Sequence, residues 1–234
     1  MSKKSWELSE EELNETVKLS EYNRYVFDQR PAFESLINFI NNLTKKLNED
    51  GEISDLYEIR ARIKAPKSAI YNDEQKALDD VFGMEIITAT EEESKKVIDC
   101  ILKYMNVIRE KNHNKKNGYK AYHKLLGLKS DILGDLDKNY IIDYVPLIEV
   151  QFKTVEVAVK CSGGTADHTV YKGHSKEDIQ RQYDNGEFSI YTNIPTMWVS
   201  RNGELKLLSP DETLKKMYPF LKIKEKNNEK GDKK

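Results

Sequence analysis

The spacing of apolar residues switches between helix and strand periodicity several times along this chain, and this restricts its fold more than any other feature. Over 31–49 the apolar side chains recur every three or four positions, which predicts a helix with one buried face. Over 57–63 and 147–155 apolar and polar residues alternate, which predicts half-buried strands. Helices that flank or separate such strands indicate a mixed α+β domain.

Capping and turn residues mark where the remaining helices and strands begin and end. Ser9 and Glu12 have the spacing of a capping box and predict a first helix over 9–30, and Pro31 then begins the helix over 31–49. The Asn-Gly step at 202–203 predicts a tight hairpin turn. Further helices are expected over 91–108 and after Ser209, and further strands over 82–89, 122–130, 196–200 and 204–208.

Composition limits the class of protein. A net charge of −2 over 234 residues argues against a protein that coats DNA by bulk charge, and no apolar run approaches the ~18 residues of a membrane span. The start lacks the pattern of a secretory signal, and the two cysteines are expected to be reduced thiols in a cytoplasmic protein. We expect N-terminal helices over 1–50, a core over 51–175, a C-terminal hairpin and short helix over 176–222, and a disordered charged tail over 223–234.

Five short segments carry residues suited to phosphate and cation binding: RIKAPKS (62–68), DDVFG (79–83), NKKNGYKAYHKL (114–125), EVQFKT (149–154) and ADHTVYK (166–172). Strand alternation puts Glu149, Gln151 and Lys153 on one face, where charges are costly unless they are paired or bind a metal. Asp80 and Glu149 together suit Mg²⁺, which takes one or two carboxylates plus phosphate oxygens. Each segment alone is also typical of a solvated strand or loop.

In order and spacing, the patterns R-x-K-x-x-x-S, D-x-F-G, N-G-Y-K-x-Y-H, E-V-Q-x-K-T and A-x-H-x-x-Y-K resemble the synthetase domain of the RelA/SpoT family, which includes the stand-alone small alarmone synthetases. The resemblance covers residues 55–172. It implies a nucleotidyltransferase-like mixed sheet of about five strands flanked by helices. It also implies an enzyme that uses Mg²⁺ to transfer the β,γ-pyrophosphate of ATP to the 3′-hydroxyl of a guanosine nucleotide such as GDP or GTP.

The resemblance also assigns roles to individual residues. On the donor side, Arg62 would lie against the adenine, Lys64 and Ser68 would hold the ATP phosphates, and Asp80 and Glu149 would bind the Mg²⁺ as catalytic residues. Glu149 is also expected to help deprotonate the acceptor hydroxyl.

On the acceptor side, Tyr119 would be the stacking platform for the base, with Gly118 leaving room above the ring. The acceptor's phosphates and ribose would meet four polar side chains, namely Lys120, His123, Gln151 and Lys153.

The chain departs from the family pattern at Glu85, where the pattern has an arginine on the other side of the adenine. A carboxylate neither stacks like a guanidinium nor attracts phosphate, so ATP would sit differently, or Arg60 or Lys67 would substitute, or activity would be low.

Three functions remain open at this point. The first is alarmone synthesis. The second is that of a toxin, paired with an antitoxin protein, that pyrophosphorylates the 3′ end of tRNA and contacts its backbone through Lys45, Lys46, Lys115 and Lys116. The third is a nucleotide-sensing module without catalysis.

Overall fold

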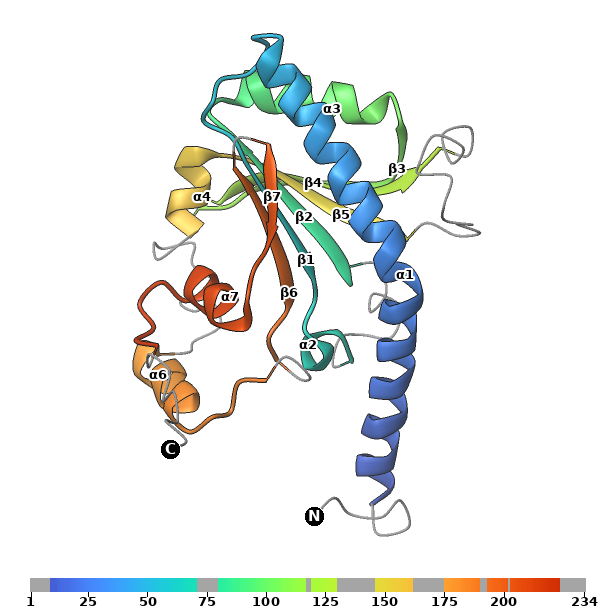
Figure 1. Cartoon of the computed structure of the whole chain (residues 1–234), viewed down its shortest axis with the longest axis vertical. Helices are drawn as coiled ribbons and strands as arrows, with labels where there is room; N and C mark the ends of the chain where they lie inside the picture. The colour runs from blue at the N-terminus through green and yellow to red at the C-terminus, as the bar shows by residue number, and fades with distance from the viewer. Residues whose placement is uncertain are drawn as a thin grey trace, which may run out of the picture.

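The protein is built on one mixed sheet of seven strands in the order β3-β4-β5-β2-β1-β6-β7, as the computed structural model shows (Figure 1). The strands are β1 Glu58–Ile63, β2 Phe82–Thr88, β3 Met105–Asn114, β4 Lys120–Leu128, β5 Ile148–Thr154, β6 Thr196–Arg201 and β7 Glu204–Leu207. Only β2 and β5 pair in parallel among these neighbours. The predicted α+β class is confirmed, with seven strands in place of about five.

The structure describes residues 9–70, 80–116, 119–129, 146–161, 175–189, 193–201 and 203–223. Several predictions therefore lie outside the described residues: those for Asp79, Gly118, the segment 166–172, Asn202 and residues 224–234 of the expected tail. Among the described helices, none is long and apolar enough to cross a membrane.

Helices cover both faces of the sheet. They are α1 Glu10–Glu49, α2 Pro66–Ile70, α3 Glu91–Leu102, α4 Val155–Cys161, α6 Lys176–Asp184 and α7 Pro210–Met217. α1 and α3 pack on one face, where Phe33, Leu36 and Ile37 of α1 are fully buried against strand residues such as Ile86 and Phe152. α4, α6 and α7 lie away from α1 (Figure 1). The face opposite α1 is only partly covered and carries the polar residues of the strands.

The two helices that we expected over 9–30 and 31–49 form one continuous helix, so the prediction that Pro31 begins a second helix was wrong. A proline inside a helix removes one backbone hydrogen bond and typically costs about 3 kcal/mol. Here residues on both sides of Pro31 pack against the same core, including Tyr22 before it and Phe33 after it. The Tyr22 hydroxyl also donates a hydrogen bond to the Lys64 carbonyl. The predicted capping box at Ser9 is confirmed.

The helix predicted over 91–108 is too long by six residues. α3 ends at Leu102, and β3 begins at Met105 and pairs with β4 up to Asn114, with a register shift between Val107 and Arg109. The apolar residue Ile108, which falls within the predicted helix, lies at this shift and is 57% exposed on the edge strand. Strand pairing has overridden the local periodicity, as tertiary contacts commonly do.

The strands predicted over 196–200 and 204–208 and the helix predicted after Ser209 are confirmed, whereas α6 was not predicted. Gly203 has φ of 79°, the left-handed conformation that the tight turn requires. α7 begins with the expected capping box between Ser209 and Glu212 and with Pro210 in its first turn. Leu214 of α7 is buried in a small second cluster with Ile179 and Ile194. β6 extends the central sheet directly by pairing with β1.

Candidate active site

A cavity of about 360 Å³ lies over the face of the sheet opposite α1, and strand alternation explains which side chains reach it. Arg62, Gly83 and Glu149 form one row across β1, β2 and β5. Arg60, Glu85 and Gln151 form the next row, and Lys153 follows on β5. The prediction that Glu149, Gln151 and Lys153 share one face is therefore confirmed.

A closed set of hydrogen bonds joins Tyr119, His123, Glu149 and Gln151 at one end of the cavity. The Tyr119 hydroxyl lies 2.6 Å from Nε2 of His123, and Nδ1 of His123 lies 3.1 Å from Oε1 of Glu149. Nε2 of Gln151 donates to Oε2 of Glu149 at 3.1 Å, and the Tyr119 hydroxyl lies 3.4 Å from Oε1 of Gln151. An ionised carboxylate only accepts hydrogen bonds, so His123 donates to Glu149 through Nδ1.

The pKa values within this set depart from their usual values. Burial raises the pKa of Glu149, but hydrogen bonds from His123 and Gln151 and the nearby charges of His123 and Arg62 outweigh burial and lower the pKa to about 2. Burial, together with the nearby groups Cys161, Glu85 and Glu149, raises the pKa of the Tyr119 hydroxyl. At neutral pH, Glu149 is therefore an ionised carboxylate that can bind a cation, and Tyr119 is a neutral donor.

The ring of Tyr119 is bordered by cations. Nζ of Lys115 lies 5.5 Å and Nζ of Lys153 lies 5.4 Å from the ring centroid. The ring of His113 also lies 5.8 Å from that of Tyr119. The ring of Tyr119 lines the cavity, and the ammonium groups of Lys115 and Lys153 lie over it.

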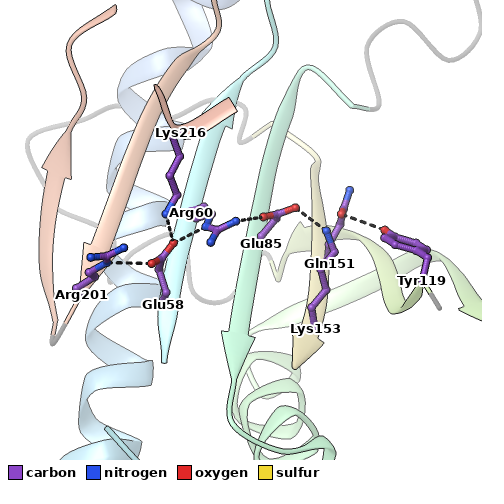
Figure 2. A network of polar contacts seen from close by, with 8 residues as sticks. All are labelled: Glu58, Arg60, Glu85, Tyr119, Gln151, Lys153, Arg201 and Lys216. Atoms are coloured by element: carbon purple, nitrogen blue, oxygen red, sulfur yellow. Dashed lines mark hydrogen bonds and ion pairs between the residues drawn. The ribbon is translucent and has the colours of Figure 1, made fainter. Parts of the chain in front are cut away.

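A line of alternating charges crosses the floor of the cavity (Figure 2). Nζ of Lys153 lies 2.5 Å from Oε1 of Glu85, and Nη1 of Arg60 lies 3.4 Å from Oε2 of Glu85. Arg60 also donates to Glu58 on its own strand. Burial raises the pKa of Glu85, but the charge and hydrogen bond of Lys153 and the charges of Arg60 and Arg62 lower it below its usual value. Glu85 is therefore a paired carboxylate, and its charge is already neutralised within the protein.

Arg62 lies flat on the sheet because its cross-strand neighbour is a glycine. A Cβ atom at Gly83 would lie 3.3 Å from Nε of Arg62, closer than side chains normally pack. The missing side chain lets the guanidinium approach β2. A planar guanidinium held in this way offers a face on which a nucleobase can stack.

Three predicted donor-side residues lie at one edge of the sheet, beside the cavity. β2 and β5 are parallel and β1 is antiparallel to β2, so the end of β1 and the starts of β2 and β5 share this edge. Lys64 pairs there with Asp80, with Nζ 2.6 Å from Oδ2. Ser68 is exposed on α2, which follows Lys64 directly.

Asp80 and Glu149, the two residues predicted to bind Mg²⁺, both lie at this edge, but only Glu149 lines the cavity. Asp80 and Glu149 are carboxylates at the starts of neighbouring parallel strands. Within the described ranges, no group of three or more His, Cys, Asp and Glu side chains could hold a metal ion. Mg²⁺ often takes one or two protein carboxylates together with substrate phosphate oxygens, so these two residues are of a suitable chemical kind. In this structure Lys64 supplies the cation that faces Asp80.

The structure does not bring Lys120 to the cavity. Lys120 is two residues from Tyr122, which packs against the core, so both lie on the face of β4 opposite His123. Its Nζ atom is paired with Glu91 of α3. Arg62, Tyr119, His123, Glu149, Gln151 and Lys153 do meet in one cavity.

Motif analysis missed several residues that line the cavity, namely His113, Cys161, Met197, Lys216 and Met217. His113 follows from the unexpected strand β3. Met197, Lys216 and Met217 come from the C-terminal hairpin and α7, which match no motif. No sequence signal connected them to the strands that carry the motifs.

Comparison with known proteins agrees with this geometry. Residues 33–176 match the family described as the region found in RelA/SpoT proteins. No curated protein sequence matches the chain. Among solved structures, the small alarmone synthetase 1 from Bacillus subtilis bound to its product pppGpp is similar, with a TM-score of 0.52 and 15% identity over 72% of this chain and 98% of that one. A GTP pyrophosphokinase family protein from Streptococcus pneumoniae has a TM-score of 0.52 and 19% identity over 70% of this chain and 85% of that one. These structures share the fold.

Proposed function

Because this chain belongs to the RelA/SpoT family, we propose that it is an ATP-dependent pyrophosphokinase that makes an alarmone from a guanosine nucleotide. One observation carries the proposal: a single cavity holds an aromatic platform at Tyr119, an ionised carboxylate at Glu149 and the cations Arg62 and Lys153. A base, a nucleophilic hydroxyl and several phosphates need such partners together.

In the proposed reaction, the 3′-oxygen of the acceptor forms a bond to the β-phosphorus of ATP while the bond from that phosphorus to the α,β-bridging oxygen breaks, and AMP leaves. Glu149 accepts the proton of the hydroxyl, and His123 and Gln151 hold its carboxylate in place. Tyr119 carries the acceptor base, while Lys64 and Ser68 hold the donor phosphates. A Mg²⁺ bound by Asp80 and Glu149 would neutralise phosphate charge. Most of the catalysis is then positioning and charge stabilisation.

The test is transfer of label from γ-³²P-ATP in the presence of Mg²⁺ to GDP, GTP, GMP, ATP or bulk tRNA, with the purified full chain. Label in guanosine tetra- or pentaphosphate supports the proposal. ATP binding without transfer to any acceptor would contradict it and would favour the nucleotide-sensing module.

A second acceptor, the 3′ end of tRNA, is favoured by the charge of the edge strand. Arg109 and Lys111 of β3 and Lys115 and Lys116 just beyond it are exposed, and this strand lies next to the acceptor end of the cavity. Such a basic rim suits a nucleic-acid backbone. Label in tRNA, together with growth arrest that a neighbouring antitoxin gene relieves, would support this acceptor over a free nucleotide.

A further inference from the structure

The end of the cavity away from Tyr119 is built by residues outside the segment that matches the family. The match ends at residue 176, whereas Met197 lies on β6, and Lys216 and Met217 lie at the end of α7. All three line the cavity together with Arg62. Met197 is the cross-strand neighbour of Arg62 on the side opposite Gly83. The C-terminal segment therefore contributes one wall of the candidate active site.

α7 is held at this position by a partly buried ion pair. Nζ of Lys216 lies 2.6 Å from Oε1 of Glu58, and the side chains are 22% and 15% exposed. Nε of Arg201 on β6 lies 3.0 Å from the other carboxylate oxygen, and Arg60 donates to the same group (Figure 2). Glu58 thereby links α7 and β6 to the strand that carries Arg62.

The two ends of the cavity differ in chemistry. The end at Tyr119 presents a phenol ring, an imidazole and an amide beside the Glu149 carboxylate, which suit the base and the ribose of the acceptor. The other end presents two thioether side chains beside the planar guanidinium of Arg62. Thioethers make favourable contacts with aromatic rings, and guanidinium groups stack on them. This combination suits a flat, uncharged, aromatic group, and a purine base is the part of a nucleotide with those properties.

We propose that α7 completes a slot for the purine base of the donor nucleotide, in which the base lies between Arg62 and the methionines Met197 and Met217. Lys216 is the positioning residue that keeps Met217 in the slot through its ion pair with Glu58. This inference rests on the proposed function, because it assigns the donor base to the end of the cavity opposite the acceptor platform. The slot also explains why Glu85 can replace the expected arginine. The methionine thioethers cover the second face of the base, so no arginine is needed there. Glu85 lies in the floor of the cavity, where it pairs with Lys153 and Arg60.

The experiment measures binding of a non-hydrolysable ATP analogue with Mg²⁺ to the full chain by calorimetry. We expect Met217→Ala to weaken binding about two- to tenfold, as the loss of a thioether–aromatic contact does. Met217→Leu restores most of the side-chain volume and should bind within about twofold of the wild type. Lys215→Met is the matched control, because Lys215 is the exposed neighbour on the same helix and does not line this cavity. The KM for the guanosine acceptor should not change in any of these variants.

The positioning role of Lys216 is tested with a second readout. Lys216→Met should weaken analogue binding at least as much as Met217→Ala, and it should speed amide exchange in residues 210–217, which Met217→Ala leaves unchanged. The proposed slot is overturned if both variants bind the analogue as the wild type does. It is also overturned if Lys216→Met binds the analogue more tightly, because α7 would then obstruct the site instead of completing it. If the wild-type chain binds no ATP analogue, both the slot and the proposed function are overturned. If the wild type transfers pyrophosphate and the variants bind the analogue as the wild type does, only the slot is overturned.

Discussion

Replacing Glu58 by glutamine should destabilise the fold, because this carboxylate faces three cations across two strands and a helix. Arg60, Arg201 and Lys216 all pair with it, and its side chain is only 15% exposed. Glutamine keeps the size of the side chain and removes the charge, which leaves the three cations close together. Loss of one partner from a partly buried ion pair is destabilising because the remaining charges stay desolvated.

The pKa of Glu58 gives the size of the effect. Burial raises this pKa, but the hydrogen bonds and charges of Lys216 and Arg60 outweigh burial and lower it from 4.5 to about 2. Each pKa unit corresponds to about 1.4 kcal/mol, so the change from 4.5 to about 2 has an upper bound of about 3.4 kcal/mol. Water in the adjoining cavities screens the site, and we expect about 2 kcal/mol at pH 7.

The sign of the pH dependence follows from the same shift. Because the folded pKa lies below the unfolded value, the stabilisation is fully present above about pH 4.5 and is lost as the pH falls towards 2. Urea unfolding of the wild type and Glu58→Gln should therefore show a difference at pH 7 that falls to less than half at pH 3. Glu156→Gln is the control, because Glu156 forms an exposed pair with Lys160 and should unfold at the wild-type midpoint. Equal stability of Glu58→Gln and wild type at pH 7, or a difference that persists undiminished at pH 3, would refute the reasoning.

Three further substitutions test the site. Glu149→Gln should abolish pyrophosphate transfer while leaving the circular dichroism spectrum and unfolding midpoint near those of the wild type; near-normal turnover would remove Glu149 from the proposed mechanism. Tyr119→Ala should raise the KM for the acceptor about tenfold or more, as loss of a base stack does, and raise the KM for ATP far less; equal rises would make Tyr119 a structural residue. Lys153→Met leaves Glu85 paired only with Arg60 and should lower the free energy of unfolding by about 2–4 kcal/mol in urea; an unchanged midpoint would show that the Lys153–Glu85 pair does not contribute to stability.

Much of the site could be predicted from short-range pattern. Alternation along EVQFKT was enough to place Glu149, Gln151 and Lys153 on one face, because side chains of a strand point to opposite sides in turn. The order of motifs was enough to identify the family. The same local reasoning failed at β3, where a helical spacing of apolar residues belongs to an edge strand.

Glu85 shows most clearly that sequence pattern does not determine the partner of a charged side chain. In the sequence it is a carboxylate in place of an expected arginine, and nothing nearby in the chain offers it a partner. In the structure Arg60 is its direct cross-strand neighbour on β1, and Lys153 reaches it from the parallel strand β5. Both contacts depend on the register between strands that are distant in sequence.

The sequence by itself determined the strands that carry the motifs, the helix caps at Ser9 and Ser209, and which polar side chains share a strand face. These properties depend on residues a few positions apart. The tertiary structure decided that α1 continues through Pro31, that Lys120 points to α3, and that α7 forms a wall of the cavity. Those outcomes depend on packing and ion pairs between distant segments, and the free energy of such contacts exceeds local preference.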